Sequence, residues 1–163
     1  MTSVALALKS AMRGAAATVS VVSTRIGEDR YAMTATSFCS VSMDPPSILV
    51  CVNQSAAMHG ALTTGAGFCL NLLTAQQRHL SVACGGAASP AERFAGGDWD
   101  DHAGTPYLPE ARCNLFCRVE RLIAHGTHTI VIGEVIDVNS QGASAPLVYL
   151  NGDYLDPQRL PAE

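Results

Sequence analysis

Short apolar runs separated by polar and glycine-containing segments dominate this chain, and most of these runs have the length and residue types of β-strands. β-Branched residues are concentrated in several of them, and residues 113–123 alternate apolar with polar side chains. We expect strands over 18–24, 31–38, 47–53, 68–73, 113–123, 127–138 and 147–151. Gly27-Glu28-Asp29 predicts a turn that joins the first two strands as a hairpin.

Helical patterns are fewer and fall irregularly between the strands. We expect helices over 3–14, capped by Ser3, over 56–64, directly after Ser55, and over 75–84. Residues 85–109 contain few element signals, which is typical of a functional or mobile loop, and the tail after Tyr154 is expected to be loosely held. No strand precedes a GxGxxG motif, so the pattern disfavours a Rossmann fold and favours a closed or half-closed antiparallel barrel with a few helices.

Composition and charge narrow the class of protein. The length of 163 residues suits a single domain over 1–163. Hydrophobic residues make up 48% and charged residues 15%, an apolar surplus that predicts a homodimer or a buried ligand. The net charge of −4 and the lack of a Lys/Arg cluster argue against a nucleic-acid partner. Lys9 and Arg13 interrupt the apolar N-terminal segment, so we expect neither a membrane span nor a signal peptide.

The six cysteines lie mostly within apolar runs and form no CxxC motif, which is typical of free core thiols in a reduced, cytoplasmic protein. Cys113 and Cys117 have the spacing of one strand face, which fits core packing better than a redox or metal pair. His59, His79 and His102 have little support as metal ligands, so no metal is expected.

The most informative stretch is 33–46, which reads MTATSFCSVSMDPP and is followed by the apolar run 48–53. Its small side chains allow the backbone to approach a flat ligand, whose polar edge the N–H groups and hydroxyls can bind. A Ser/Thr-rich strand followed by a turn is the alternative, and the residue types alone do not separate the two.

This stretch resembles the flavin reductase-like family, whose members are small reductases that supply reduced flavin to separate oxygenase components. Further segments fall in the family's order: Met12-Arg13, 18–24, Ser55, 68–73, Arg93-Phe94, 128–135 and 146–149. The resemblance implies a mainly β fold with helices, the FMN-binding split barrel of antiparallel Greek-key strands, and a homodimer. It also implies an NAD(P)H:flavin oxidoreductase that binds FAD or FMN and takes its hydride from NADH or NADPH.

The phosphate of the flavin is expected where the strand ends at Asn53 and a helix begins, because N–H groups at a helix N-terminus attract anions. Ser55 would either donate to the phosphate or only cap the helix, and Arg93 would either supply a cation or lie free on the surface. The resemblance favours the binding role for both. It implies a flavin site made of Thr34, Ala35, Thr36, Ser37, Ser40, Val41, Cys51, Val52, Asn53, Ser55, Ala56, Asn71, Leu72, Leu73 and Arg93.

The resemblance also implies a catalytic position for His128, close to the nicotinamide. The family has Gly-Asp-His where this chain has Gly126-Thr127-His128, so the carboxylate that could orient the imidazole is missing. A stacking or positioning role is still compatible with this change. His125 is expected on the opposite face of the strand. Tyr149 and Tyr154 would either cover the dinucleotide or pack in the core or a dimer interface.

The leading hypothesis is hydride transfer from NAD(P)H to a flavin, which then diffuses to a separate oxygenase. Catalysis would depend mainly on proximity and orientation. The alternative is a split barrel that holds flavin tightly as a prosthetic group and acts as a carrier or reduces another bound substrate. The sequence does not decide between FAD and FMN or between NADH and NADPH.

Overall fold

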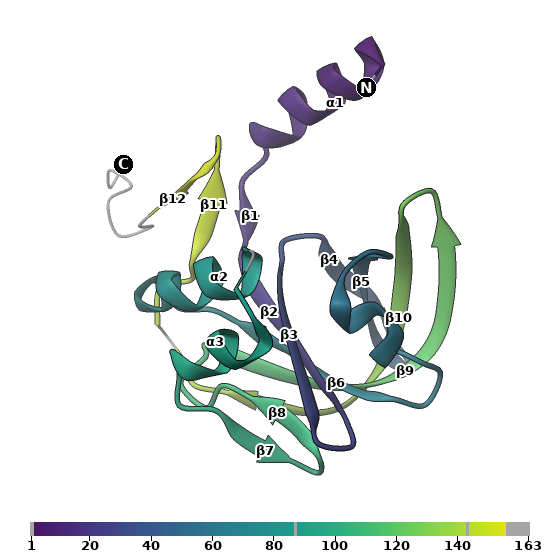
Figure 1. The fold of residues 1–163 in the computed structure, drawn as a ribbon, viewed down its shortest axis with the longest axis vertical. Coiled ribbons are helices and arrows are strands. Elements are labelled where there is room, and N and C mark those ends of the chain that lie inside the picture. The colour runs from purple at the N-terminus through teal and green to yellow at the C-terminus, as the bar shows by residue number, and fades with distance from the viewer. Residues whose placement is uncertain (1, 87, 143, 156–163) are drawn as a thin grey trace.

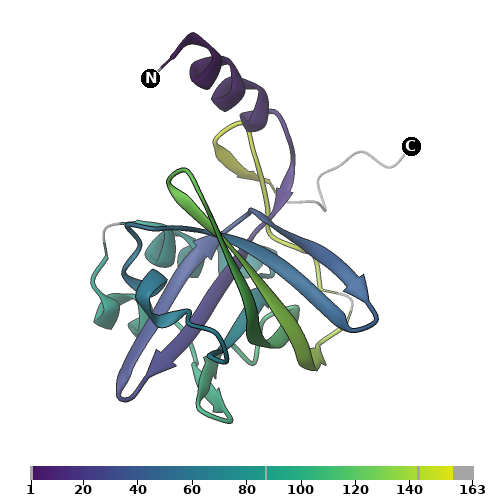
Figure 2. The same cartoon turned by 90° about the vertical axis from the view of Figure 1, so that its right-hand side faces the viewer.

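The computed structural model describes residues 2–86, 88–142 and 144–155, which form a curled antiparallel sheet with short helices on its outside (Figures 1 and 2). The main sheet of this part has seven strands in the order β3-β2-β6-β9-β10-β5-β4. Their bounds are β2 (Ser20–Ile26), β3 (Asp29–Ala35), β4 (Phe38–Met43), β5 (Pro46–Asn53), β6 (Gly67–Leu72), β9 (Cys113–His125) and β10 (His128–Ser140). The mainly β, antiparallel fold predicted from the sequence is confirmed.

The sheet is curled because its two edge strands are consecutive in the chain. β3 and β4 lie at opposite edges of the sheet, yet only Thr36 and Ser37 connect them. Three Cα–Cα steps span at most about 10 Å, so the two edges must approach each other. β3 also contacts β5, the neighbour of β4. The result is a barrel that is split between β3 and β4.

Two hydrophobic clusters hold the fold together, one inside the barrel and one between the sheet and the helices. The barrel interior contains Val22, Val50, Val52, Phe68, Leu70, Val119 and Val131. The second cluster contains Val19, Val21, Ala32, Leu73, Leu80, Phe94, Leu108 and Leu147. Val21 and Val22 belong to different clusters because alternate residues of a strand face opposite sides of the sheet.

The remaining elements are not part of the main sheet, although Met58 of the first 3-10 helix packs into the barrel core. The helices are α1 (Ser3–Arg13), the 3-10 helices η1 (Ala57–Ala61) and η2 (Ala75–Gln77), α2 (Arg78–Gly85) and α3 (Pro90–Ala95). A small sheet joins β1 (Ala17–Thr18), β11 (Val148–Leu150) and β12 (Asp153–Leu155), and β7 (Asp100–His102) pairs with β8 (Thr105–Tyr107). α1 projects from the body (Figures 1 and 2), and none of its residues is buried.

Several local expectations differ from the structure. α1 is capped by the side chain of Thr2 rather than by Ser3, and the helix expected over 56–64 is only the short η1. The segment 85–109, expected as a loop, contains α3 and the β7–β8 hairpin. The expected tail after Tyr154 lies, beyond Leu155, outside the described residues. Within the described ranges, no helix is both long and apolar enough to cross a membrane.

Candidate functional site

The split between β3 and β4 exposes the small polar residues that the sequence singles out. Thr36 and Ser37 are exposed, and the Ser37 carbonyl accepts a hydrogen bond from the Cys51 N–H at 2.9 Å. This bond holds the connection against β5. A ligand at the split would therefore meet backbone and hydroxyl groups rather than bulky side chains.

A cavity of about 420 Å³ lies at the β3 side of the split. It brings together four predicted site residues from distant parts of the chain, Thr34, Thr36, Tyr149 and Tyr154. The two tyrosine rings meet edge-on, with centroids 5.3 Å apart. Aromatic walls combined with a few hydroxyl groups suit a flat heterocycle with polar edges.

The C-terminal half of α2 forms the opposite wall of this cavity, which sequence reasoning missed. Ser81 links two predicted residues: its carbonyl accepts from the Thr34 hydroxyl at 2.7 Å, and its Oγ lies 2.8 Å from the Tyr154 hydroxyl. A Cβ on Gly85 would stand 3.4 Å from the Thr34 Cβ, so a small residue at this position keeps α2 close to β3. The i, i+4 spacing of Ser81 and Gly85 on one helix face was the signal available in the sequence.

The loop after β5 corrects the expected phosphate site. Ser55 does not cap a helix: its N–H and its Oγ both donate to the Asn53 Oδ1 at 2.9 Å, and the N-cap of η1 is Ala56, which makes no side-chain cap hydrogen bond. η1 has five residues in 3-10 geometry, so it lacks the aligned N–H groups of an α-helix N-terminus. The Ser55 hydroxyl is exposed, but it already donates its proton to Asn53, so it would bind an anion only by giving up that hydrogen bond.

Arg93 lies close to the same loop and clamps two elements together. Its guanidinium donates to the carbonyls of Ala32, Gly86 and Ala88, at 2.7, 3.0 and 3.0 Å. It lines a cavity of about 110 Å³ together with Ala57, which follows the predicted residue Ala56. Among the ion pairs of the described residues, none involves Arg93, so no carboxylate neutralises its charge there. Arg93 can therefore attract an anion bound at the loop.

The β9–β10 hairpin carries His128 at its tip. Gly126 takes a positive φ of 57°, as glycine does in two-residue hairpin turns. The Thr127 Oγ1 lies 2.9 Å from the His128 Nδ1, so a hydroxyl holds the imidazole where a carboxylate was expected from the resemblance. Gln54 donates from its N–H to the Thr127 carbonyl at 2.9 Å and from its side chain to the His128 carbonyl at 3.3 Å, which ties the tip to the loop after β5.

The prediction that His125 and His128 lie on opposite faces is wrong. The chain reverses between them, so His125 ends β9 and pairs directly with His128 at the start of β10. Residues paired in this way share one face of the sheet. His128 also pairs with Asn53 of β5, which places the three residues in one row. Within the described residues, no group of three or more His, Cys, Asp or Glu side chains is arranged to hold a metal ion.

Three predicted side chains belong to the core instead of an open site, because Val52, Asn71 and Leu73 are fully buried. The Asn71 amide donates to the Val21 carbonyl at 2.8 Å and accepts from the Leu108 N–H at 2.9 Å. It also accepts from the Asn114 side chain at 2.9 Å, so its polar groups are already engaged. The expectation that Asn71 contacts a ligand is therefore corrected to a structural role.

The other predicted residues differ in their access to a ligand. Leu72 packs against the barrel core, Ala35 is buried in it and Cys51 is half-buried. Ser40 and Val41 are exposed on the edge strand β4. The structure thus separates the predicted site into the split with its cavity, the loop after β5 with Arg93, and the hairpin tip.

Thiol chemistry is suppressed beside the cavity. All six cysteines are free thiols, and Cys84 of α2 is buried behind the cavity wall. Burial raises the pKa of Cys84 to about 11, although the nearby Arg93 charge partly opposes this. Burial also raises the pKa of Cys117, inside the barrel, to about 12. These thiols stay protonated at neutral pH and act as packing groups.

Known proteins share both the sequence and the fold. Residues 12–157 match the family described as "Flavin reductase like domain". The FMN reductase (NADH) RutF of Pseudomonas syringae pv. syringae is 40% identical over 97% of this chain and 88% of its own length. The reductase component of the FADH(2)-dependent resorcinol hydroxylase of Rhizobium sp. is 40% identical over 90% and 83%.

Solved structures with a similar fold point to the same family. A putative flavin reductase from Haemophilus somnus superposes with a TM-score of 0.88 at 32% identity, over 92% of this chain and 97% of that one. The NADH:FAD oxidoreductase SgcE6 of Streptomyces globisporus, in complex with NAD and FAD fragments, gives 0.86 at 30% identity, over 95% and 94%. With the split barrel and its polar mouth in place, these likenesses show that the chain belongs to the flavin reductase-like family.

Proposed function

We propose that this protein is an NAD(P)H-dependent flavin reductase that reduces FAD or FMN and releases the reduced flavin to a separate monooxygenase. The observation that supports it most is the cavity at the split, where Thr34, Thr36, Tyr149 and Tyr154 converge. Relatives with the same fold are named as NADH-dependent FMN reductases and as the reductase component of a hydroxylase. Flavin is thus a substrate in this proposal.

The residues at the split serve to place two rings against each other. Thr36 and Ser37 offer hydroxyl and backbone groups to the polar edge of the flavin, and the tyrosines supply flat apolar surface. A hydride then passes from the dihydronicotinamide C4 to the flavin N5, carrying both electrons. Neither ring needs a protein acid for this step, so the protein contributes proximity and orientation.

His128 is the residue proposed to position the nicotinamide. Its imidazole is exposed at the hairpin tip, and Thr127 fixes the ring through the Nδ1 contact. The tip is also tied to the loop after β5 through Gln54. An imidazole held in this way provides a flat surface at a defined place.

A homodimer is part of the proposal because α1 exposes apolar residues that the described part of the chain leaves uncovered. Val4, Leu8 and Met12 lie at i, i+4 and i+8, on one face, and are 75%, 61% and 61% exposed. An isolated helix of eleven residues is only marginally stable in water. Packing against a second copy would cover this face and stabilise the helix.

The test of the function is NADH oxidation by the purified protein, with and without FAD or FMN in excess over the enzyme. Many turnovers driven by free flavin, together with release of reduced flavin, would support the reductase. Flavin that copurifies, with no stimulation by added flavin, would favour the prosthetic-group alternative. No NADH consumption under either condition would refute both the reductase and the role of His128.

A further inference from the structure

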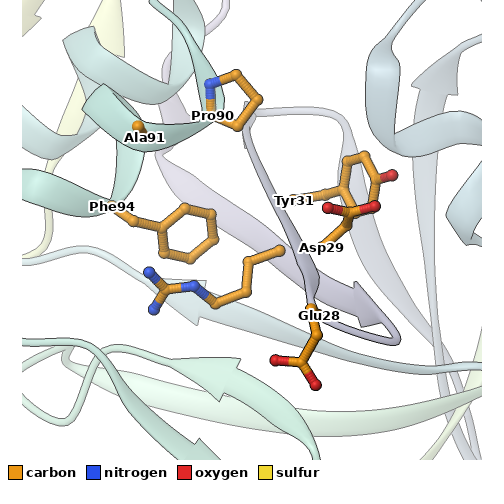
Figure 3. A pocket seen from close by; sticks show the side chains of 7 residues that line it. Glu28, Asp29, Tyr31, Pro90, Ala91 and Phe94 are labelled. Carbon is orange, nitrogen blue, oxygen red and sulfur yellow. The ribbon is translucent and has the colours of Figure 1, made fainter.

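A cleft runs from the loop after β5 to the turn of the β2–β3 hairpin. It consists of two cavities, of about 110 Å³ and about 380 Å³, that share the wall residues Arg30, Tyr31 and Pro90. Ala57, Met58 and Arg93 belong to the smaller cavity alone, and Glu28, Asp29 and Phe94 to the larger one alone. Figure 3 shows the larger cavity, with Phe94 of α3 on one side and Tyr31 and Asp29 on the other.

The near end of this cleft lies beside the loop after β5, where the flavin phosphate is expected from the sequence. Arg93 and Ala57 line the smaller cavity, and Ser55 and Ala56 directly precede Ala57. FMN ends at its phosphate, whereas FAD continues with a second phosphate, a ribose and an adenine. The larger cavity therefore lies where only the longer flavin would reach.

The charges along the cleft change from positive near the loop after β5 to negative at the far end. FAD would present its phosphates and then its adenosine in the same order. Arg93 lines only the smaller cavity, where the first phosphate would lie, and Arg30 lies between the two cavities, where the second phosphate of FAD would follow. Glu28 and Asp29 line only the far cavity. Carboxylates there can accept hydrogen bonds from ribose hydroxyls and from the adenine amino group, both of which are donors.

A flat surface for the adenine is also present. The Arg30 Cζ lies 4.3 Å from the centroid of the Phe94 ring, and the Phe94 ring packs against Trp99 with centroids 4.5 Å apart. Phe94 is buried, so it supports the exposed Arg30 from below. A guanidinium placed over an aromatic ring can stack on a base with its other face.

We propose that this cleft binds the adenosine 5′-diphosphate group of FAD and thereby makes FAD the preferred flavin substrate over FMN. The proposal rests on the reductase function proposed above. The same chemical group also occurs in NADH, but the adjacency of the cleft to the flavin phosphate site assigns it to FAD.

The test compares both flavins with the full-length wild-type protein and with Arg30→Ala, Arg30→Lys and Arg121→Ala. Arg121 is an exposed arginine on β9 that lines neither cavity, so it controls for loss of charge. We expect the wild type to favour FAD over FMN in kcat/KM. Arg30→Ala should lower kcat/KM for FAD about tenfold, mainly through KM, as loss of one base-stacking partner does, and should change FMN less than about twofold. Arg30→Lys keeps the charge but loses the flat face, so it should recover only part of the loss.

Three kinetic results would overturn the proposal: equal use of both flavins by the wild type, an equal loss for both in Arg30→Ala, or a raised KM for NADH when FMN is the acceptor. The last would assign the cleft to the nicotinamide dinucleotide.

Calorimetric binding of FAD and FMN without NADH separates this question from the reductase function. If no flavin is turned over but FAD binds more tightly than FMN and Arg30→Ala removes the difference, the cleft assignment stands while the reductase proposal fails. Equal binding of both flavins would overturn the cleft assignment.

Discussion

At the scale of single residues, Thr127 contacts the imidazole of His128 with a hydroxyl, where the resemblance associates this position with a carboxylate. Either group can orient the ring. The hydroxyl of Thr127 reaches the imidazole Nδ1 at 2.9 Å, so it can orient the ring, but it adds no negative charge. An uncharged partner favours positioning over proton transfer as the role of His128.

Replacement of His128 by Ala should therefore raise the KM for NADH about tenfold while kcat changes less than about threefold, because ground-state positioning is lost and hydride transfer itself needs no acid. Thr127→Val, which removes only the hydrogen bond, should raise this KM about fivefold, the effect of roughly 1 kcal/mol. Steady-state kinetics with varied NADH measure both. The KM for flavin serves as the internal control, and unchanged NADH kinetics in His128→Ala would contradict the role.

Because burial raises the pKa of its core thiols, the protein should become less stable as the pH rises into the alkaline range. The folded-state pKa of Cys84 is raised to about 11, above the value of about 8.5 for a thiol in an unfolded chain. The stability from this group is fully present below about pH 8.5 and is lost as the pH rises towards 11, because the unfolded state releases the proton first. The free energy of unfolding should fall by about 1 kcal/mol per pH unit from this thiol alone.

Urea denaturation at pH 8, 9 and 10 checks this dependence. Cys84→Ala should make the profile less steep by about 1 kcal/mol per pH unit, while Cys117 keeps its own contribution, and Cys39→Ala, at an exposed position, should leave the slope as in the wild type. Equal slopes in the wild type and Cys84→Ala would refute the assignment.

At the scale of elements, the sheet depends on a close approach between β6 and β10. A Cβ on Gly133 of β10 would stand 2.6 Å from two atoms of the Phe68 ring and 3.1 Å from the Cys117 Cβ. Phe68 is fully buried inside the barrel. The glycine is therefore required by the curvature of the sheet at this point, where the β9–β10 register also shifts.

Gly133→Ala should lower the free energy of unfolding by about 1–3 kcal/mol, the usual cost of overpacking a core. Gly60→Ala is the matched control, because no atom lies within 4 Å of its Cβ position, and it should change stability by less than about 0.5 kcal/mol. Denaturant melts of the three proteins provide the comparison. A Gly133→Ala protein as stable as the wild type would show that Phe68 can repack.

Helix α1 is the element whose stability depends most on a partner. Its C-terminus is anchored, since the Arg13 carbonyl accepts from the Asn151 N–H at 2.7 Å, but its apolar face is open. Leu8→Glu should shift the protein from dimer to monomer in light scattering after size-exclusion chromatography, because a charge would have to be buried in the interface. Ser10→Glu adds the same charge on the other side of the helix and should remain a dimer. A monomeric wild type would remove the dimer from the proposal.

Most strands of the main sheet were predictable from the sequence because their alternating or β-branched patterns extend over several residues. The edge strand β4 was missed, since the prediction ended a strand at Phe38 and placed none over 39–46. The short elements were not, since η1 and the β7–β8 hairpin depend on contacts with distant strands. The pairing of His125 with His128 was missed because one turn glycine, Gly126, reverses the chain between them. Asn71 was misassigned because its strand-end position looked open, whereas Leu108 and Asn114 enclose it.

At the scale of the whole molecule, the site is built from parts that meet only when the sheet curls. The cavity combines β3, α2 and the β11–β12 pair, while His128 and Arg93 come from other regions. The spacing of Ser81 and Gly85 places both on one helix face, but only the folded structure brings that face against Thr34. The sequence therefore predicts the fold class more completely than it predicts which residues line the site.

The two-residue connection at Thr36 and Ser37 limits how far apart β3 and β4 can lie. Its length therefore sets the width of the opening between these two strands. Because it joins the first and last strands of the sheet, an inserted residue would let the two edges drift apart without breaking a single ladder hydrogen bond. The width of the mouth is therefore encoded by a loop length rather than by side-chain identity. Insertion libraries at this one site would tune the size of the heterocycle admitted and leave the hydrophobic core untouched.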